Sequence, residues 1–140
     1  MRLNLIVANE SLLDATQQMR APKLIHFSSL MCGLIHDINR FSTVGKFLSY
    51  CRLVKGSHTS AGKNYGSPGK KIGNAHLKWA FGEAVPLLKR CSPEASAFAD
   101  RIEKKRGKAR AFSYLAVKLG RAVYYMLKRN EAFEIDRMLR

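Results

Sequence analysis

Acidic residues are scarce in this chain of 140 residues, which has 10 Asp and Glu against 25 Lys and Arg and a formal net charge of +15. Between Ile38 and Gly82 there is no acidic residue, while eight residues are basic. So large a positive surplus repels itself unless an anion is bound, which favours a polyanionic partner, with DNA or another nucleic acid as the first expectation. A merely soluble basic surface is the alternative.

Long apolar runs, paired cysteines and metal-binding clusters are also missing. No stretch is long enough to cross a bilayer and no signal-peptide pattern opens the chain, so we expect a cytoplasmic protein without a membrane partner. Cys32, Cys51 and Cys91 are odd in number and widely spaced, which is typical of reduced core residues. No His, Cys and carboxylate group has metal-ligand spacing, so no metal site is expected.

Strand patterns are hard to find, whereas apolar residues recur at helical spacing along most of the chain. The length suits one domain with a single core. Two apolar stripes at helical spacing precede a glycine-rich stretch. The first stripe consists of Leu24, Phe27, Leu30, Met31, Leu34, Ile35 and Ile38, and the second consists of Val44, Phe47, Leu48, Cys51 and Val54.

Capping residues mark the later helices. Asn74 is a suitable N-cap for a helix over His76 to Arg90, which includes the bulky residues Trp79 and Phe81. The sequence Ser92-Pro93-Glu94 predicts the start of another helix, extending through Lys105. Gly107 then separates it from a long helix over residues 109–129.

A loop rich in glycine and lysine interrupts this pattern at residues 55–73. Five of the ten glycines lie between Gly56 and Gly73, and together with Pro68 they oppose both helix and strand. We therefore predict a small all-α domain with a long Gly/Lys-rich loop between helices. Free backbone amides and lysines suit contact with a phosphate backbone. The candidate nucleic-acid-binding residues are Lys55, Lys63, Lys70, Lys71, Asn74, His76 and Lys78.

A second basic region follows between Arg101 and Arg129, where ten basic residues accompany one acid, Glu103. It is either a second nucleic-acid surface or a solvated helix face, since helix surfaces often carry lysine and arginine.

Residues 38–84, INRFSTVGKFLSYCRLVKGSHTSAGKNYGSPGKKIGNAHLKWAFGEA, resemble the C-terminal transposase domain of bacterial insertion-sequence transposases related to the Piv invertase. Full-length members join an N-terminal DEDD, RuvC-like domain to this serine domain. The resemblance implies a DNA recombinase in which Ser60 occupies the position of the nucleophile that attacks a DNA phosphodiester, with a guide RNA in the members that use one. The resemblance extends from about Leu30 to Arg129 and is carried by Arg40-Phe41, Leu53, Ser60-Ala61-Gly62, residues 71–77, Gly107-Lys108 and residues 116–119.

The resemblance also implies a missing partner. In the family the DEDD domain supplies acidic residues for divalent ions, whereas residues 38–82 have none. We therefore expect no cofactor in this chain, Mg²⁺ only with a DEDD-domain transposase chain, and no activity from this chain alone. Where the family has a Pro-Gly-Ile-Gly hairpin, this chain reads RAPKL at residues 20–24. We accordingly expect a truncated copy, with residues 1–23 an unmatched lead and residues 24–140 the helical transposase domain.

Two alternatives remain for a chain of this composition. One is a non-catalytic nucleic-acid-binding remnant of a mobile element, in which Ser60 has only a turn-forming role. The other is an inert pseudogene product.

Overall fold

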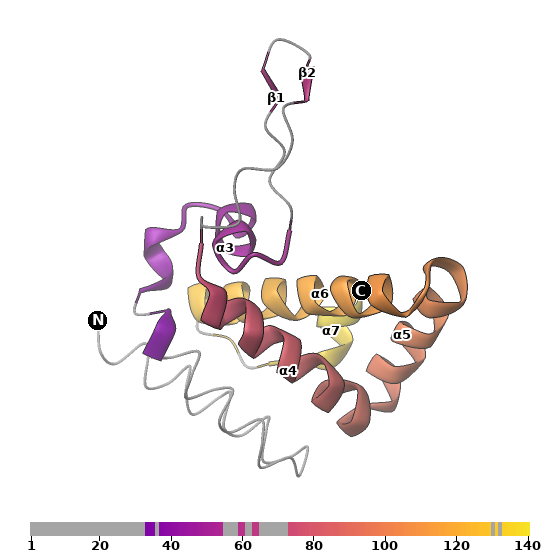
Figure 1. The fold of residues 1–140 in the computed structure, drawn as a ribbon. Helices are drawn as coiled ribbons and strands as arrows, with labels where there is room; N and C mark the ends of the chain where they lie inside the picture. The colour runs from indigo at the N-terminus through magenta and orange to yellow at the C-terminus, as the bar shows by residue number, and fades with distance from the viewer. Residues whose placement is uncertain are drawn as a thin grey trace.

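The computed structural model describes residues 33–35, 37–54, 59–60, 63–64, 73–129, 131 and 133–140. Figure 1 shows helices gathered into one body, with a small strand pair outside it. The elements in chain order are the 3-10 helix η1 (Ile38–Arg40), α3 (Val44–Tyr50), β1 (Thr59–Ser60), β2 (Lys63–Asn64), α4 (Ala75–Cys91), α5 (Pro93–Arg106), α6 (Lys108–Arg129) and α7 (Ile135–Leu139).

The prediction of an all-helical body is confirmed, with one correction inside the loop. Strands β1 and β2 pair antiparallel, with Thr59 opposite Asn64 and Ser60 opposite Lys63. The expectation that the whole loop opposes strand is therefore wrong at these four residues. Two residues, one of them Gly62, separate the strands in the sequence, which is the commonest spacing for a hairpin.

Local capping explains where the long helices begin. The Asn74 Oδ1 accepts hydrogen bonds from the amides of His76 (2.8 Å) and Leu77 (3.1 Å), as predicted for the start of α4. The Ser92 Oγ accepts from the Ala95 amide at 3.1 Å and donates to Glu94 Oε2 at 2.8 Å. The start predicted at Ser92 is therefore confirmed.

Gly107 separates α5 from α6, as predicted, with a φ of 85° that favours glycine. The flanking helices each extend one residue further than the sequence indicated, to Arg106 and from Lys108. Short α7 was not predicted.

Helix α6 is the central element of the core. It contacts η1, α3, α4, α5 and α7, and it lies across the body in Figure 1. The apolar faces of α3, α4 and α6 meet there, because their apolar residues recur at helical spacing and can be removed from water together. The largest fully buried side chains are Phe47, Cys51, Leu77, Phe81, Val85, Leu115 and Val123.

The chain leaves α3 through a Schellman motif. The Leu53 amide donates to the Leu48 carbonyl and the Arg52 amide donates to the Ser49 carbonyl, both at 3.0 Å. Arg52 has a φ of 55°, in the left-handed position where glycine is usual. A Cβ on Gly120 of α6 would lie 2.7 Å from side-chain atoms of both Leu48 and Leu53, so the motif packs directly on that glycine.

The prediction that Val54 belongs to the second apolar stripe is wrong. The periodicity placed it with Phe47 and Cys51, yet it is 36% exposed, whereas those two are fully buried. Because the helix ends before it, Val54 no longer follows a helical period. In the described ranges no helix combines the length and apolar character needed to cross a membrane.

Candidate nucleic-acid interface

The two ends of the loop meet at one fixed point between α3 and α4. The Asn74 amide donates a hydrogen bond to the Tyr50 carbonyl oxygen at 2.7 Å, which joins the start of α4 to the end of α3. Asn74 is also the N-cap of α4, so one residue sets both the helix start and the loop base. The loop is therefore closed at its base by backbone contacts.

Gly73, the last residue of the loop, is required by this closure. Its φ is 95°, a conformation that side chains disfavour. A Cβ at this position would lie 2.5 Å from the Tyr50 carbonyl oxygen and 3.2 Å from both the Ser49 carbonyl oxygen and a side-chain carbon of Arg52. Only glycine lets the two backbones approach this closely.

The candidate nucleophile Ser60 lies in β1, and its register partner is Lys63 of β2. In Figure 1 the strand pair lies apart from the helical body, and no described helix contacts either strand. For Ser60 and Lys63 the description is of the backbone alone, while Lys55, Lys70 and Lys71 lie outside the described residues. The hairpin thus places a lysine directly across from the serine.

The first turn of α4 brings together the remaining predicted residues, Asn74, His76 and Lys78. His76 and Lys78 are exposed, and the turn contains no acid. The positive end of the helix dipole is therefore not compensated locally. The Asn74 oxygen is committed to capping, which leaves only its side-chain NH₂ to donate to an outside acceptor.

Trp79 is a residue in this region that was not predicted to belong to a site. It is 62% exposed, the most exposed of the large apolar side chains described, and lies three residues after His76 on the same helical face. The sequence contained a signal for this exposure, because Trp79 falls outside the series of apolar residues at helical spacing. The members of that series are the residues that α4 buries, Leu77, Ala80, Phe81, Ala84, Val85 and Leu88. Exposed tryptophan beside cations suits stacking on a nucleic-acid base.

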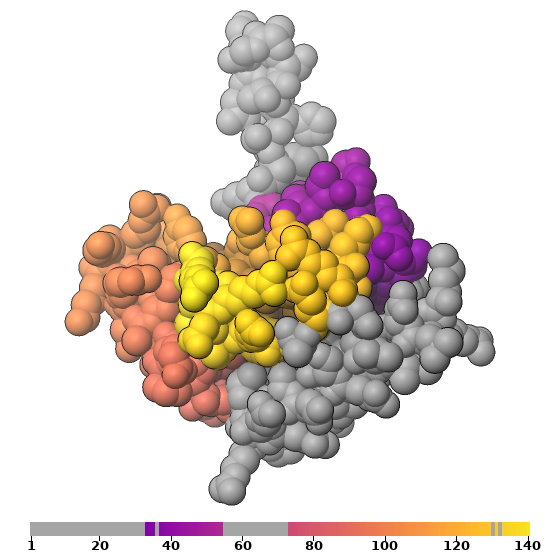
Figure 2. Space-filling model, turned by 180° about the vertical axis from the view of Figure 1, so that it is seen from behind, coloured from indigo at the N-terminus to yellow at the C-terminus, as the bar shows by residue number. Residues whose placement is uncertain are grey.

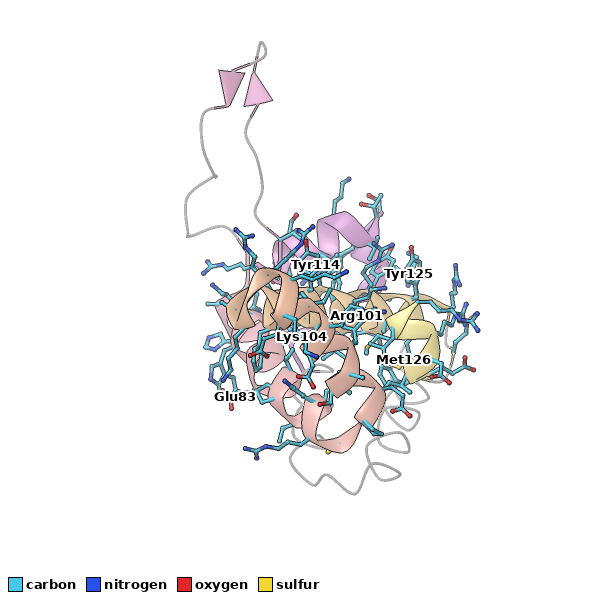
Figure 3. All side chains as sticks on the ribbon, turned by 90° about the vertical axis from the view of Figure 1, so that its right-hand side faces the viewer. Glu83, Arg101, Lys104, Tyr114, Tyr125 and Met126 are labelled. Atoms are coloured by element: carbon cyan, nitrogen blue, oxygen red, sulfur yellow. The ribbon has the colours of Figure 1, made fainter. Side chains whose placement is uncertain are left out.

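A second basic region lies where α5 passes into α6. Figure 3 looks onto this corner and labels Arg101 and Lys104 on α5 and Tyr114 on α6. Arg106 donates a hydrogen bond to the Tyr114 hydroxyl at 2.8 Å. The exposed basic residues of this corner are Arg101, Lys104, Lys105, Arg106, Lys108 and Arg110.

Nearby acids do not neutralise this corner, because Lys89 of α4 pairs with them. Its Nζ lies 2.7 Å from Asp100 and 3.6 Å from Glu103. The hydrogen bond between Lys89 and Asp100 raises the pKa of Lys89 and lowers the pKa of Asp100. The corner therefore keeps an excess of positive charge.

A divalent metal does not fit the described residues. No group of three His, Cys, Asp or Glu side chains in that part of the chain could hold an ion. The sequence between Ile38 and Gly82 also offers no carboxylate to the loop. Metal ligands for a reaction at Ser60 would have to come from another chain or from elsewhere in this one.

These features define a small, strongly basic helical domain in which the two ends of a glycine-rich segment meet at a fixed base. The Transposase IS116/IS110/IS902 family model matches residues 25–100, which is just over half of the chain, and the protein belongs to this family. The match spans η1, α3, the loop, α4 and the first half of α5. No curated protein and no solved structure matches the chain.

The predicted insertion-sequence transposase family is thereby confirmed. The relation to the Piv invertase stays a prediction, as does the domain boundary after residue 23.

Proposed function

We propose that this transposase domain binds DNA through the loop and the first turns of α4, and that Ser60 is the nucleophile that attacks a DNA phosphodiester. The main support is the closed base of the loop, formed by Gly73 and the hydrogen bond from Asn74 to Tyr50. This base sets where an acid-free, lysine-rich segment leaves and rejoins the helical body. A phosphate backbone held beside His76 and Lys78 would then lie within reach of the loop.

The proposed reaction is transfer of a phosphoryl group to serine. The Ser60 Oγ forms a bond to phosphorus, one P–O ester bond breaks, and the departing oxygen takes up a proton as a hydroxyl group. The Ser60 proton passes to a base, because a neutral serine is a weak nucleophile. Lys63, opposite Ser60 in the hairpin, is suited to stabilise the charge that develops on the phosphate oxygens.

The proposal requires a partner for the proton-accepting and metal-binding roles. Residues 38–82 contain no carboxylate, so the base and the ligands for Mg²⁺ are assigned to the DEDD domain of a transposase chain. A guide RNA is a further proposed partner. By itself, this chain is expected to bind DNA without cutting or joining it.

Binding and chemistry can be tested separately with the purified chain. Binding to a duplex containing the ends of the element should weaken steeply with salt, with a slope of log affinity against log salt of about −3 to −4.5 if three to five lysines contact phosphates. Ser60→Ala should leave this affinity unchanged. With a DEDD-domain chain, Mg²⁺ and the relatives' guide RNA added, a covalent protein–DNA adduct should form with the wild type.

The Ser60→Ala variant decides the role of the serine. Loss of the adduct with unchanged DNA affinity supports the nucleophile assignment, and Ser57→Ala in the same loop is the matched control. An adduct that persists in Ser60→Ala contradicts the assignment. Salt-sensitive binding that never yields an adduct would instead support the alternative, a non-catalytic nucleic-acid-binding protein.

A further inference from the structure

A cavity of about 440 Å³ lies between the later part of α6 and the C-terminal segment that contains α7, and none of its described lining residues belongs to the loop. Figure 2 shows α7, in yellow, lying against this part of α6 on the face opposite to the view of Figure 1. We call this cavity the α6–α7 groove. Its basic lining residues are Lys118, Arg121, Arg129, Arg137 and Arg140.

The charge of the α6–α7 groove is positive and only partly compensated. Two glutamates share the lining, and one of them, Glu131, accepts a hydrogen bond from Arg137 at 2.7 Å. The Lys118 Nζ donates to the Leu139 carbonyl at 3.3 Å, which holds the end of α7. Within the described part of the chain, no ion pair to an acid involves Arg121 or Arg129.

These two arginines lie on one face of α6, with Tyr125 midway between them. Residues four apart are neighbours on a helix surface, so the row Arg121, Tyr125, Arg129 runs along the groove for about 12 Å at 1.5 Å per residue. Both arginines are exposed. The row therefore offers two cations and one aromatic ring along a single line.

The Tyr125 ring is already packed against its neighbours in the structure. The Arg129 guanidinium lies over the Tyr125 ring, 4.8 Å from its centroid. On another side Tyr125 meets Tyr124 edge to face, with ring centroids 5.3 Å apart. Tyr124 is itself fixed, because it is buried and its hydroxyl donates to the Phe41 carbonyl at 3.2 Å.

We propose that the α6–α7 groove is a binding site for single-stranded nucleic acid, in which Arg121 and Arg129 contact the backbone and the Tyr125–Arg129 pair stacks on an unpaired base. Aromatic rings and guanidinium planes in a cationic groove are the features that bind single strands. In a duplex the bases are stacked on one another and cannot reach Tyr125. The cavity volume suits about one nucleotide unit.

This site is distinct from the loop, so the two can be tested independently in the full chain. Fluorescence anisotropy would measure binding of a labelled single-stranded DNA of about 12 nucleotides, the RNA of the same sequence, and the corresponding duplex. Tyr125→Leu should weaken single-strand binding about tenfold. Tyr125→Phe should preserve it, and duplex affinity should change less than about twofold in both.

The arginines have a matched control pair where α5 passes into α6. Arg121→Gln with Arg129→Gln should reduce the single-strand salt slope by about 1.4, at about 0.7 per phosphate contact. Lys105→Gln with Arg110→Gln removes the same charge at the α5–α6 corner and should change the slope less.

Three results would overturn the proposal. One is an equal decrease of the single-strand salt slope in the control pair, and another is unchanged single-strand binding in Tyr125→Leu. The third is competition by AMP alone that is as strong as competition by the unlabelled oligonucleotide. DNA and RNA arms that agree within about twofold would assign the site to single strands in general. A clear preference would assign it to one of them. Loss of duplex binding in loop variants, with single-strand binding intact, would separate this site from the proposed DNA-binding function.

Discussion

The Asn74 amide donates a hydrogen bond to the carbonyl oxygen of Tyr50 at 2.7 Å, and this contact joins residues on either side of the loop. A hydrogen bond between buried or half-buried backbone groups contributes about 1 kcal/mol. Its greater consequence is geometric, because it fixes where the loop leaves and rejoins the helical body. Substitutions at this base should therefore affect folding stability and nucleic-acid binding together.

Gly73→Ala should be strongly destabilising. The new Cβ would lie 2.5 Å from the Tyr50 carbonyl oxygen, and the φ of 95° is strained for alanine. We expect a loss of at least about 2 kcal/mol in the free energy of unfolding, measured by urea denaturation. DNA affinity should fall as well, because the loop base must open.

Gly107→Ala is the control that measures the cost of a positive φ without a steric contact. Gly107 also has a positive φ, of 85°, but a Cβ there meets no atom within 4 Å. Its cost should therefore be limited to the conformational strain of a φ of 85° with a ψ of 160°, on the order of 1 to 3 kcal/mol, with DNA affinity unchanged. Equal effects of the two substitutions would show that contact with Tyr50 does not constrain Gly73.

Asn74→Ala should destabilise the protein by about 1 kcal/mol, because two amides of α4 lose their acceptor. Asn74→Asp keeps an acceptor and should cost less stability, yet it places a negative charge beside the proposed phosphate contacts. Thermal melts and duplex-binding titrations of the two variants should therefore rank them in opposite orders. Equal DNA binding by the Asp variant and the wild type would place the start of α4 away from the DNA.

Much of the fold could be predicted because its determinants are local. Asn74, Ser92 and Gly107 each act on the adjacent turn, and the structure places helix boundaries within a residue of the predicted ones there. The end of α3 could not be predicted in this way. It uses Arg52 at a left-handed position that favours glycine, and the packing of Leu48 and Leu53 on distant Gly120 accompanies this unusual choice.

The candidate site was predicted only in its residue types. The charges and the acid-free composition of the loop are visible in the sequence, whereas the meeting of Tyr50 with Asn74 depends on tertiary packing. The α6–α7 groove depends on the position of α7, five residues with no strong helical signal of their own. Exposure of Trp79 could have been inferred from the helical period, since the core positions of α4 lie on another face.

The thiol of Cys51 should be unreactive in the folded protein. Burial raises the pKa of Cys51 to about 12, while nearby Arg40 acts in the opposite direction. At about pH 8 only about one thiol in ten thousand would be ionised, and the side chain is fully buried. Alkylation followed by peptide mass spectrometry should label half-buried Cys91 in the native protein and Cys51 only after unfolding in guanidinium. Equal labelling rates in the native state would contradict the burial of Cys51.

The Lys89 pair should make stability depend on pH in acid. The folded pKa of Asp100 is lowered by its hydrogen bond with Lys89, so the contribution of the pair is complete above the ordinary pKa of 3.8 and is lost as the pH falls through the lower folded value. The raised pKa of Lys89 means that the contribution is lost on the alkaline side only above 10.5.

Comparison of Lys89→Gln with the wild type would measure this dependence. The variant should have the lower Tm between about pH 5 and pH 9, and this difference should shrink as the pH falls below 3.8 and disappear by about pH 2, where the carboxylates are protonated. At that pH Lys89 only adds to the surplus positive charge of the chain, so it no longer stabilises the fold. A wild-type advantage that persists at about pH 2 would contradict this account of the pair.

Trp79→Ala separates a binding role from a structural one. Because Trp79 is 62% exposed and lies outside the packed face of α4, its removal should change the free energy of unfolding by no more than about 0.5 kcal/mol. If the indole packs against a sugar of the bound duplex, whose bases are stacked on one another, duplex affinity should fall severalfold. Trp79→Phe should recover most of the affinity in the same duplex-binding titration.

The matched control for Trp79 is Tyr114 at the α5–α6 corner, another exposed aromatic residue, 43% exposed. Tyr114→Ala should leave duplex affinity unchanged, because this corner lies on other helices than the base of the loop. Equal loss of affinity in Trp79→Ala and Tyr114→Ala would show that the DNA does not select the α4 side of the molecule. Loss in Trp79→Ala alone places the bound DNA beside the base of the loop, where His76 and Lys78 are exposed on the same turns of α4.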